Sequence, residues 1–283
     1  MLKQRILTAL VLAALFLGAL FGFGPVQFAL FAGLVIAVGA WEWSRLAGLL
    51  GATARLAYLV LVAGVMAALF LLSGLAEGRA DPAVVRPLLL LGCLWWALAL
   101  LWVQGYPSSA LLWGSVAARL VMGVLVLVPA WLAMGVLVQR DDGYWLILLV
   151  VLVVAGADVG AYFTGRALGR HKLAPAVSPG KTLEGLAGGL ATVLVLASVF
   201  LAASPQHRDL WWQWALVVAT TALASVLGDL LESMVKRHRG VKDSGVILPG
   251  HGGILDRIDS LCAALPVFCL LYLLLIAGGP WRS

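Results

Sequence analysis

Three aspartates in the second half of the chain stand where apolar sequence meets polar sequence. Asp229 follows nineteen uncharged residues, 210–228, and Asp256 and Asp259 are spaced i,i+3, which puts both on one helix face. A carboxylate at a membrane boundary is costly unless it is paired or binds a cation. Mg²⁺ prefers oxygen ligands, so we expect these three to bind one or two Mg²⁺. As an alternative, Asp256 could pair with Arg257 or cap a helix.

A cluster of basic residues and glycines lies beside these acids. Lysine and arginine neutralise phosphate, and glycine lets backbone N–H groups approach it closely. Together with metal-binding acids, they are typical of phosphoryl or nucleotidyl transfer. We expect Lys236 and Arg237 to act with the three aspartates as catalytic residues. The expected phosphate contacts in this segment are Lys242, His251, Gly252, Gly253 and Arg257. Attraction to lipid headgroups is the alternative for such a basic run.

The segment Ser178-Pro-Gly-Lys-Thr182 resembles part of a P-loop. The P-loop pattern requires a glycine five residues before Gly180, but position 175 is proline. The preceding apolar stretch also has the character of a membrane span, not of a strand in a βαβ unit. We therefore reject a P-loop ATPase and keep Ser178, Lys181 and Thr182 as expected phosphate contacts.

The composition restricts the elements that can position these residues. The 283 residues are 63% apolar and 11% charged, with a mean hydropathy of +1.05. A soluble domain is about 45–50% apolar and about 25% charged, so a soluble protein, a disordered chain and collagen are excluded. The three cysteines, Cys93, Cys262 and Cys269, lie in apolar runs and are expected to be core residues. We predict an all-α, polytopic transmembrane helix bundle.

A membrane-spanning helix needs about 20 apolar residues, and this spacing predicts about nine spans. Residues 6–41 carry no Asp, Glu, Lys or Arg, and Gly24-Pro25 divides them into two spans. A cleaved signal peptide over residues 1–22 is the alternative, but no convincing small-residue cleavage site precedes Gly24, and a retained helix is favoured. The predicted spans are 6–22, 25–41, 56–76, 87–104, 117–138, 144–158, 185–204, 211–231 and 260–279.

Basic residues are distributed unevenly between the two sides of this predicted topology. Thirteen of the nineteen lie on the side of the N-terminus: Lys3, Arg5, Arg45, Arg55, Arg166, Arg170, Lys172, Lys181, Lys236, Arg237, Arg239, Lys242 and Arg257. Cytoplasmic loops carry such an excess, so we expect the N-terminus and the loops 164–184 and 232–259 in the cytoplasm. We expect one integral membrane domain, 1–283, with 1–140 mainly scaffold and 141–283 catalytic. Asp158 is placed at the end of the sixth span, and its role and that of Asp243 are left open.

The segment 233–259 resembles the signature of the phosphatidate cytidylyltransferase, or CDP-diacylglycerol synthase, family. It reads Ser-x-x-Lys-Arg, then Lys-Asp, then Pro-x-His-Gly-Gly-x-x-Asp-Arg-x-Asp, without a gap over 27 residues. The segment 178–185, Ser-Pro-Gly-Lys-Thr-x-Glu-Gly, and the Gly228-Asp229 pair are also similar to the family. The resemblance is strong from about Asp158 onward, whereas residues 1–140 match only in general character.

The resemblance implies the Mg²⁺-dependent reaction CTP + phosphatidate → CDP-diacylglycerol + pyrophosphate at the cytoplasmic face of a bacterial-type inner membrane. It implies that Asp229, Asp256 and Asp259 are the metal ligands, and it adds Lys181, Lys236, Arg237, Lys242 and Arg257 as phosphate contacts. Partners are the substrates and membrane lipids, with a homodimer considered and no nucleic acid. CDP-alcohol phosphotransferases have an Asp-Gly-x-x-Ala-Arg pattern that is absent from this sequence. A cation-coupled transporter would place polar groups in two matching halves, whereas here they lie in one.

Overall fold

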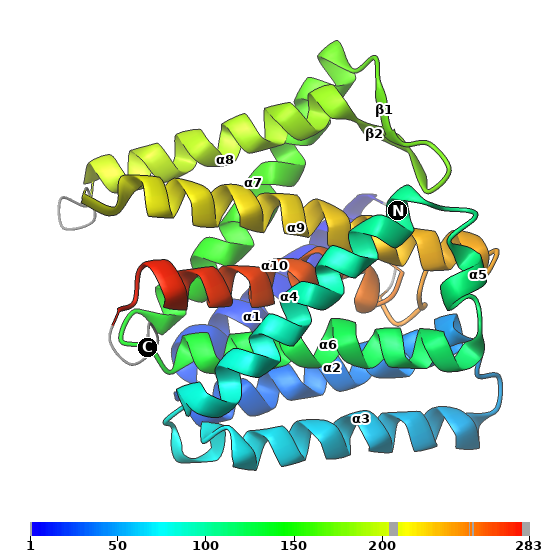
Figure 1. Cartoon of the computed structure of the whole chain (residues 1–283), viewed down its shortest axis with the longest axis horizontal. Helices are drawn as coiled ribbons and strands as arrows, with labels where there is room; N and C mark the ends of the chain where they lie inside the picture. Colours follow the sequence, from blue (N-terminus) through cyan, green and yellow to red (C-terminus); the bar gives the residue numbers. More distant parts are fainter. Residues whose placement is uncertain (1, 204–208, 249, 251, 279–283) are drawn as a thin grey trace.

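The computed structural model describes residues 2–203, 209–248, 250 and 252–278, and it is almost entirely α-helical. The long helices are α1 (Leu2–Gly22), α2 (Pro25–Ala47), α3 (Ala52–Leu72), α4 (Pro82–Gln104), α6 (Val116–Val138), α7 (Gly143–Leu168), α8 (Leu183–Ala203), α9 (Trp211–His238) and α10 (Leu255–Leu275). The short elements are the 3₁₀ helix η1 (Leu75–Glu77), the helix α5 (Ala110–Trp113) and the strands β1 (Lys172–Ala174) and β2 (Ser178–Thr182). These elements form one bundle (Figure 1).

Eight of the described helices, α2 to α4 and α6 to α10, are long and apolar enough to cross a membrane, judged by length and composition. The apolar part of α1, Ile6–Gly22, is shorter. Eight such helices and one shorter apolar helix confirm the prediction of an all-α polytopic bundle of about nine spans. The chain is a multi-pass membrane protein.

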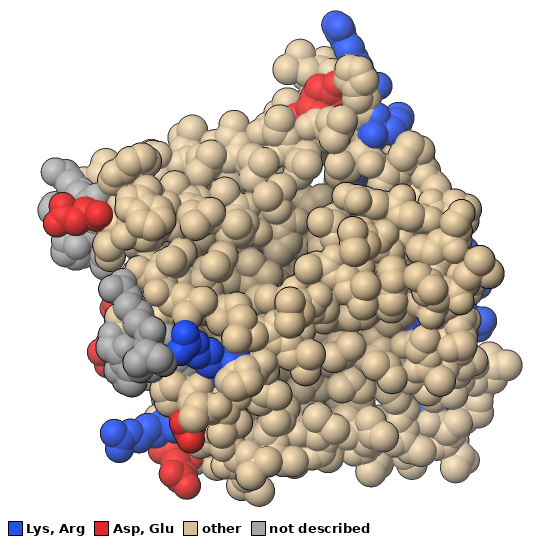
Figure 2. Space-filling model, viewed as in Figure 1, with Lys and Arg blue, Asp and Glu red and all other residues tan. Residues whose placement is uncertain are grey.

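The surface of the bundle has the distribution that a membrane requires. Large apolar side chains such as Leu34, Leu71 and Val195 are more than half exposed on the outside of the helices. Figure 2 shows Lys, Arg, Asp and Glu gathered toward the two ends of the helices on this face, with uncharged surface between them. Lipid tails are as apolar as a leucine side chain. Apolar side chains can therefore be exposed on this surface without a loss of stability.

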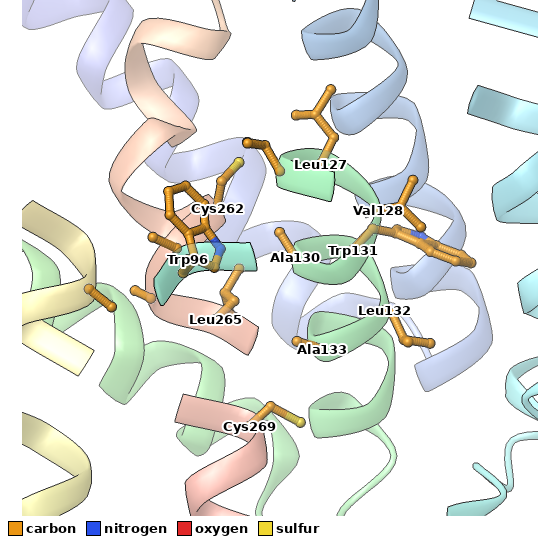
Figure 3. Close-up of a cluster of buried hydrophobic side chains, with 14 of the residues drawn as sticks. Trp96, Leu127, Val128, Ala130, Trp131, Leu132, Ala133, Cys262, Leu265 and Cys269 are labelled. Atoms are coloured by element: carbon orange, nitrogen blue, oxygen red, sulfur yellow. The ribbon is translucent and has the colours of Figure 1, made fainter. Parts of the chain in front are cut away.

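The helices α6 and α10 form the centre of the bundle. α6 packs against α2 and α10, and α10 also packs against α4 and α9. Figure 3 shows the contact, where Trp96 of α4 and Ala130 of α6 lie near Cys262 and Leu265 of α10. Cys262 and Cys269 are buried, Cys93 is half-buried, and all three are free, which confirms that they are core residues.

Several helices extend beyond their predicted bounds, α2 for example to Ala47, and in the second half of the chain this corrects the positions of several polar residues. α7 continues to Leu168, so Asp158 lies within the helix and not at its end. α9 continues to His238, and α10 begins at Leu255. The predicted loops 164–184 and 232–259 are therefore shorter, at 169–182 and 239–254. Apolar length predicts where a helix enters hydrocarbon, but a helix can continue past that point in polar sequence.

The loop between α7 and α8 contains a small antiparallel sheet that the sequence did not predict. β1 pairs with β2 through Lys172 with Thr182 and Ala174 with Ser178. Beyond this hairpin, α7 and α8 pack against each other. Glycines let the two helices approach closely: a Cβ at Gly188 would meet the side chain of Thr164. Such small-residue contacts are typical of helix packing in membranes.

The hairpin, α5 and the α9–α10 connection lie at one end of the bundle, and the C-terminal end of α10 lies at the other (Figure 1). This arrangement brings the two predicted polar loops together. Arg237 Nε, near the end of α9, donates to the carbonyl oxygen of Val177 in the hairpin at 3.3 Å. We call this side of the molecule the hairpin end.

Candidate active site

Four carboxylates meet near the hairpin end, where α9 and α10 pack together. Asp229 and Glu232 are one helical turn apart on α9, and Asp256 and Asp259 are one turn apart in the first turns of α10. Asp259 interacts electrostatically with both Asp229 and Lys236, and Glu232 interacts with Asp259 and Asp256. The three predicted metal ligands are therefore neighbours, and Glu232 joins them.

Lys236 lies between the two helices and neutralises part of this charge. Its Nζ is 2.7 Å from Asp256 Oδ1 and 3.4 Å from Glu232 Oε1. Glu232 and Lys236 are spaced i,i+4 on α9, and this spacing brings their side chains together. A buried ammonium between carboxylates offsets the cost of removing each charge from water. The prediction that Lys236 acts with the aspartates fits this geometry.

Asp256 is held by the loop that precedes α10. Its Oδ2 accepts hydrogen bonds from Gly253 N at 2.8 Å, Ser244 N at 3.0 Å and Ser244 Oγ at 2.9 Å. The bond to Gly253 N spans three residues at the start of the helix. Because its donors come from this loop and from Lys236 of α9, the carboxylate, 8% exposed, has a fixed orientation.

The donor chemistry of the cluster fits a hard divalent cation. Both carboxylate oxygens of Glu232 are buried and make no hydrogen bond among the described residues, and apart from the 3.4 Å ion pair of Oε1 with Lys236 the side chain, 2% exposed, has no charge partner of opposite sign in that part of the chain. Buried carboxylates in this state are stabilised by a cation, and oxygen ligands suit Mg²⁺. Within the described residues, no three acidic, histidine or cysteine side chains are arranged closely enough to enclose a metal as they stand.

The hairpin supplies a second lysine to the cluster. Lys181 Nζ is 2.6 Å from Asp229 Oδ2, and Ser233 Oγ donates to Asp229 Oδ1 at 3.1 Å. Lys181 and Asp158 also line a cavity of about 350 Å³ between α7, α8, the hairpin and α9. Figure 2 shows the surface hollowed below the hairpin. A cavity of this size has the volume of a small-ligand site.

The lining of this cavity contains both polar and apolar side chains. Lys181, Thr182, Arg166 and Asp158 lie beside Tyr162, Leu173, Leu186 and Val226. A ligand with an anionic group and an apolar body matches such a lining. At this end of the membrane bundle, the cationic side chains of Lys181 and Arg166 in the cavity can neutralise a phosphate group.

A comparison with protein families supports a role in phosphate chemistry, independently of the geometry of the site. The model described as the cytidylyltransferase family matches residues 3–275. The chain belongs to the cytidylyltransferase family. It is a nucleotidyltransferase enzyme, and the resemblance recognised in the segment 233–259 is confirmed.

Two curated relatives extend over nearly the whole of this cytidylyltransferase. A phosphatidate cytidylyltransferase of Pseudomonas aeruginosa is 47% identical over 271 residues, covering 96% of this chain and 97% of its own. One from Haemophilus influenzae is 46% identical, covering 96% and 99%. One from Staphylococcus haemolyticus is 49% identical over 135 residues, about half of each chain.

Other predicted site residues of this cytidylyltransferase lie away from the carboxylates. Arg237 is exposed and holds the hairpin through Val177. Lys242 and Arg257 are exposed on the loop 239–254 and on the first turn of α10. His251 lies outside the described residues. Their roles as phosphate contacts stay predictions, since the structure holds no substrate.

The predicted contacts in the hairpin and in the glycine pair have structural partners. Thr182 Oγ1 accepts from Gly185 N at 3.1 Å, which caps the start of α8, and Ser178 begins β2. Gly253 N already donates to Asp256. Gly252 has φ +83°, a left-handed conformation that favours glycine, and a Cβ there would meet Asp256. Contact of either glycine with phosphate stays a prediction.

Sequence reasoning missed Glu232 and Glu42 in this family member. Glu232 is three residues after Asp229 and four before Lys236, a spacing that places all three on one helix face. Glu42, on α2, is 2% exposed, and its Oε2 accepts from Leu255 N at 2.8 Å. A lone acid in the run Trp41-Glu-Trp-Ser44 at the end of an apolar span was the available signal.

Proposed function

We propose that this protein transfers a cytidylyl group from CTP to phosphatidate, giving CDP-diacylglycerol and pyrophosphate in a Mg²⁺-dependent reaction. The family match and the names of the two full-length relatives support the reaction. The observation that carries the proposal for this chain is the cluster of carboxylates and two lysines beside an amphipathic cavity, at one end of a membrane bundle.

The proposed reaction needs no strong general base from the protein. A phosphate oxygen of phosphatidate, already anionic near neutral pH, attacks the α-phosphorus of CTP. The new P–O bond forms as the bond from that phosphorus to the oxygen bridging the β-phosphate breaks, and pyrophosphate leaves with the electron pair. Catalysis then rests on positioning and on neutralising charge.

The residues divide this work between them. Asp229, Asp256 and Asp259, with Glu232, would hold one or two Mg²⁺, which neutralises the triphosphate and its leaving group when bound. Lys236 fixes Asp256, and Lys181 is held by Asp229 at the mouth of the cavity. The Lys181 ammonium, which lines the cavity, would bind a substrate phosphate there. Lys242, Arg257 and the 251–253 segment are proposed as further phosphate contacts.

The location of the cavity suits one water-soluble and one lipid substrate. Tyr162, Leu173 and Leu186 face the same space as Lys181 and Arg166, so a phosphate can be bound while the acyl chains stay among apolar side chains. CTP is available on the cytoplasmic side. We therefore propose a cytoplasmic membrane location, with the hairpin end and the N-terminus in the cytoplasm, in agreement with the basic residues of the loops.

Two organisational features belong to the same proposal. The residues 141–283 form the catalytic region of a single membrane domain, and 1–140 are mainly scaffold, although Glu42 of that half contacts the start of α10. A homodimer stays a prediction.

The decisive experiment uses the purified protein in detergent–lipid micelles with radiolabelled CTP, phosphatidate and Mg²⁺. We expect label from CTP to become chloroform-soluble only when phosphatidate is present, and EDTA to abolish the transfer. Reconstituted vesicles test the transporter alternative in parallel. Uptake of CTP driven by an ion gradient, without label in lipid, would overturn the proposed reaction.

A further inference from the structure

Glu42 connects the first half of the molecule to the carboxylate cluster through a single serine. Its Oε2 lies 3.2 Å from Ser244 Oγ, and the same hydroxyl lies 2.9 Å from Asp256 Oδ2. Ser244 is fully buried. A serine hydroxyl has one proton and two lone pairs, so it donates to one carboxylate at a time. The two carboxylates are thereby coupled through one group.

Glu42 also contacts the far end of the same loop. Its Oε2 accepts from Leu255 N at 2.8 Å, where α10 begins. One carboxylate oxygen thus holds both Ser244, near the start of the loop 239–254, and Leu255, just after its end. Asp256 is the next residue along α10. The loop is thus held to Glu42 at two points, and Asp256 directly follows the second of them.

Arg45, one turn further along α2, reinforces the contact. Its guanidinium donates to the carbonyl oxygen of Ser244 at 2.9 Å and reaches that of Asp243 at 3.4 Å. Two side chains of α2 therefore contact the same serine, Glu42 at its hydroxyl and Arg45 at its backbone carbonyl. Close packing leaves little space around it: a Cβ at Gly253 would meet both Ser244 Oγ and Glu42 Oε2.

A role in stability alone does not account for a carboxylate at this position. Glu42 Oε1 is buried without a hydrogen-bond partner among the described residues, and a buried, half-satisfied carboxylate is costly. Such features gather at functional sites, where they fix a reacting group in place. The contacts lead from Glu42 to Asp256, a proposed metal ligand.

We propose that Glu42 is a positioning residue: acting through Ser244, it fixes the orientation in which Asp256 binds the cation. The proposal rests on the proposed function, since it assigns a role in cation binding at that site. Glu42 itself touches no substrate. The first half of the chain then contributes to cation binding without supplying a ligand.

The test is a double-mutant cycle that combines Glu42→Ala with Ser244→Ala. Two readouts are followed: turnover at saturating CTP, and the Mg²⁺ concentration that half-saturates the rise in unfolding temperature in the absence of substrate. We expect each single variant to raise the half-saturating Mg²⁺ about tenfold, the effect of losing one hydrogen bond to a charged group. Because both residues act on Asp256 through the same contacts, the double variant should raise the half-saturating Mg²⁺ no more than the more affected single variant does.

Glu42→Gln and Gln139→Ala are the matched variants. The amide oxygen of Glu42→Gln can still accept from Leu255 N, so we expect Mg²⁺ binding within about threefold of wild type. Gln139 holds a loop at the opposite end through Ala80 N at 2.8 Å and Leu75 O at 3.1 Å. We expect Gln139→Ala to lower the unfolding temperature and leave the half-saturating Mg²⁺ unchanged.

Two outcomes would overturn the proposal. One is a double variant whose effect equals the product of the two single effects, since this would mean independent action. The other is a Glu42→Ala protein that is less stable but has wild-type dependence on Mg²⁺. Failure of the proposed function is a separate result, because it would be seen in the wild-type protein as absence of label in lipid.

Discussion

Lys181 on strand β2 and Asp229 on α9 form an ion pair of 2.6 Å. This pair joins the hairpin to the helix that carries two of the four clustered carboxylates. Lys181 also lines the cavity to which Asp158 contributes. The ammonium is therefore placed between the carboxylate cluster and a space that could hold a substrate phosphate.

The first prediction concerns Lys181. Lys181→Met should lower turnover or raise the KM for phosphatidate by about tenfold or more, because one charge-assisted contact to phosphate is lost. The measurement is transfer of labelled CMP to lipid over a range of phosphatidate concentrations.

Lys172→Met is the matched control on the same hairpin. Lys172 is exposed on β1, opposite Thr182, and we expect little effect. Equal losses in the two variants would argue for a general electrostatic role of the hairpin and against a specific contact of Lys181.

The second prediction concerns Asp259. Asp259→Asn should lower turnover by orders of magnitude even at saturating Mg²⁺, because the charge stabilisation supplied by a bound metal amounts to several kcal/mol, on the order of a hundredfold or more in rate. Asp141→Asn, an exposed residue at the opposite end, should retain wild-type activity. Near-normal turnover of the Asp259 variant would remove that residue from the metal site.

The third prediction concerns Glu232, whose carboxylate oxygens have no donor among the described residues. Glu232→Gln keeps the size of the side chain and removes the negative charge beside Lys236. If Glu232 takes part in cation binding, the Mg²⁺ needed for half-maximal turnover should rise at least about tenfold.

Unfolding measured on the same Glu232→Gln sample separates binding from stability. Because a buried carboxylate without donors is costly, its replacement should leave the metal-free protein as stable as wild type or more stable. A less stable variant with an unchanged requirement for Mg²⁺ would assign Glu232 a structural role instead.

The fourth prediction concerns orientation. In a cysteine-free background, Lys242→Cys, on the exposed loop 239–254, should resist a membrane-impermeant maleimide in intact cells and react after lysis. Asp141→Cys, at the opposite end, should react in intact cells. The reverse pattern would place the hairpin end outside the cytoplasm, away from CTP, and the proposed site with it.

The sequence by itself was sufficient for the class of fold, and it already named most of the residues of the candidate site. Apolar runs of span length determine helices in a membrane because backbone polar groups there have no water to bond. The spacing of residues along one helix also predicts directly which side chains share a helix face. Asp256 and Asp259 share a face of α10, and the same rule, applied to Asp229, Glu232 and Lys236, would have added Glu232 to the site.

Tertiary structure decided which of these groups meet. Glu42 and Ser244 are 202 residues apart in the chain, and no local pattern predicts that α2 holds the loop before α10. The hairpin pairing and the contact of Lys181 with Asp229 likewise depend on how α7, α8 and α9 pack. Periodicity reports the environment of a residue along its own helix, whereas the partner across a helix interface is set by the packing of the whole bundle, since close-packed side chains fix each helix against its neighbours.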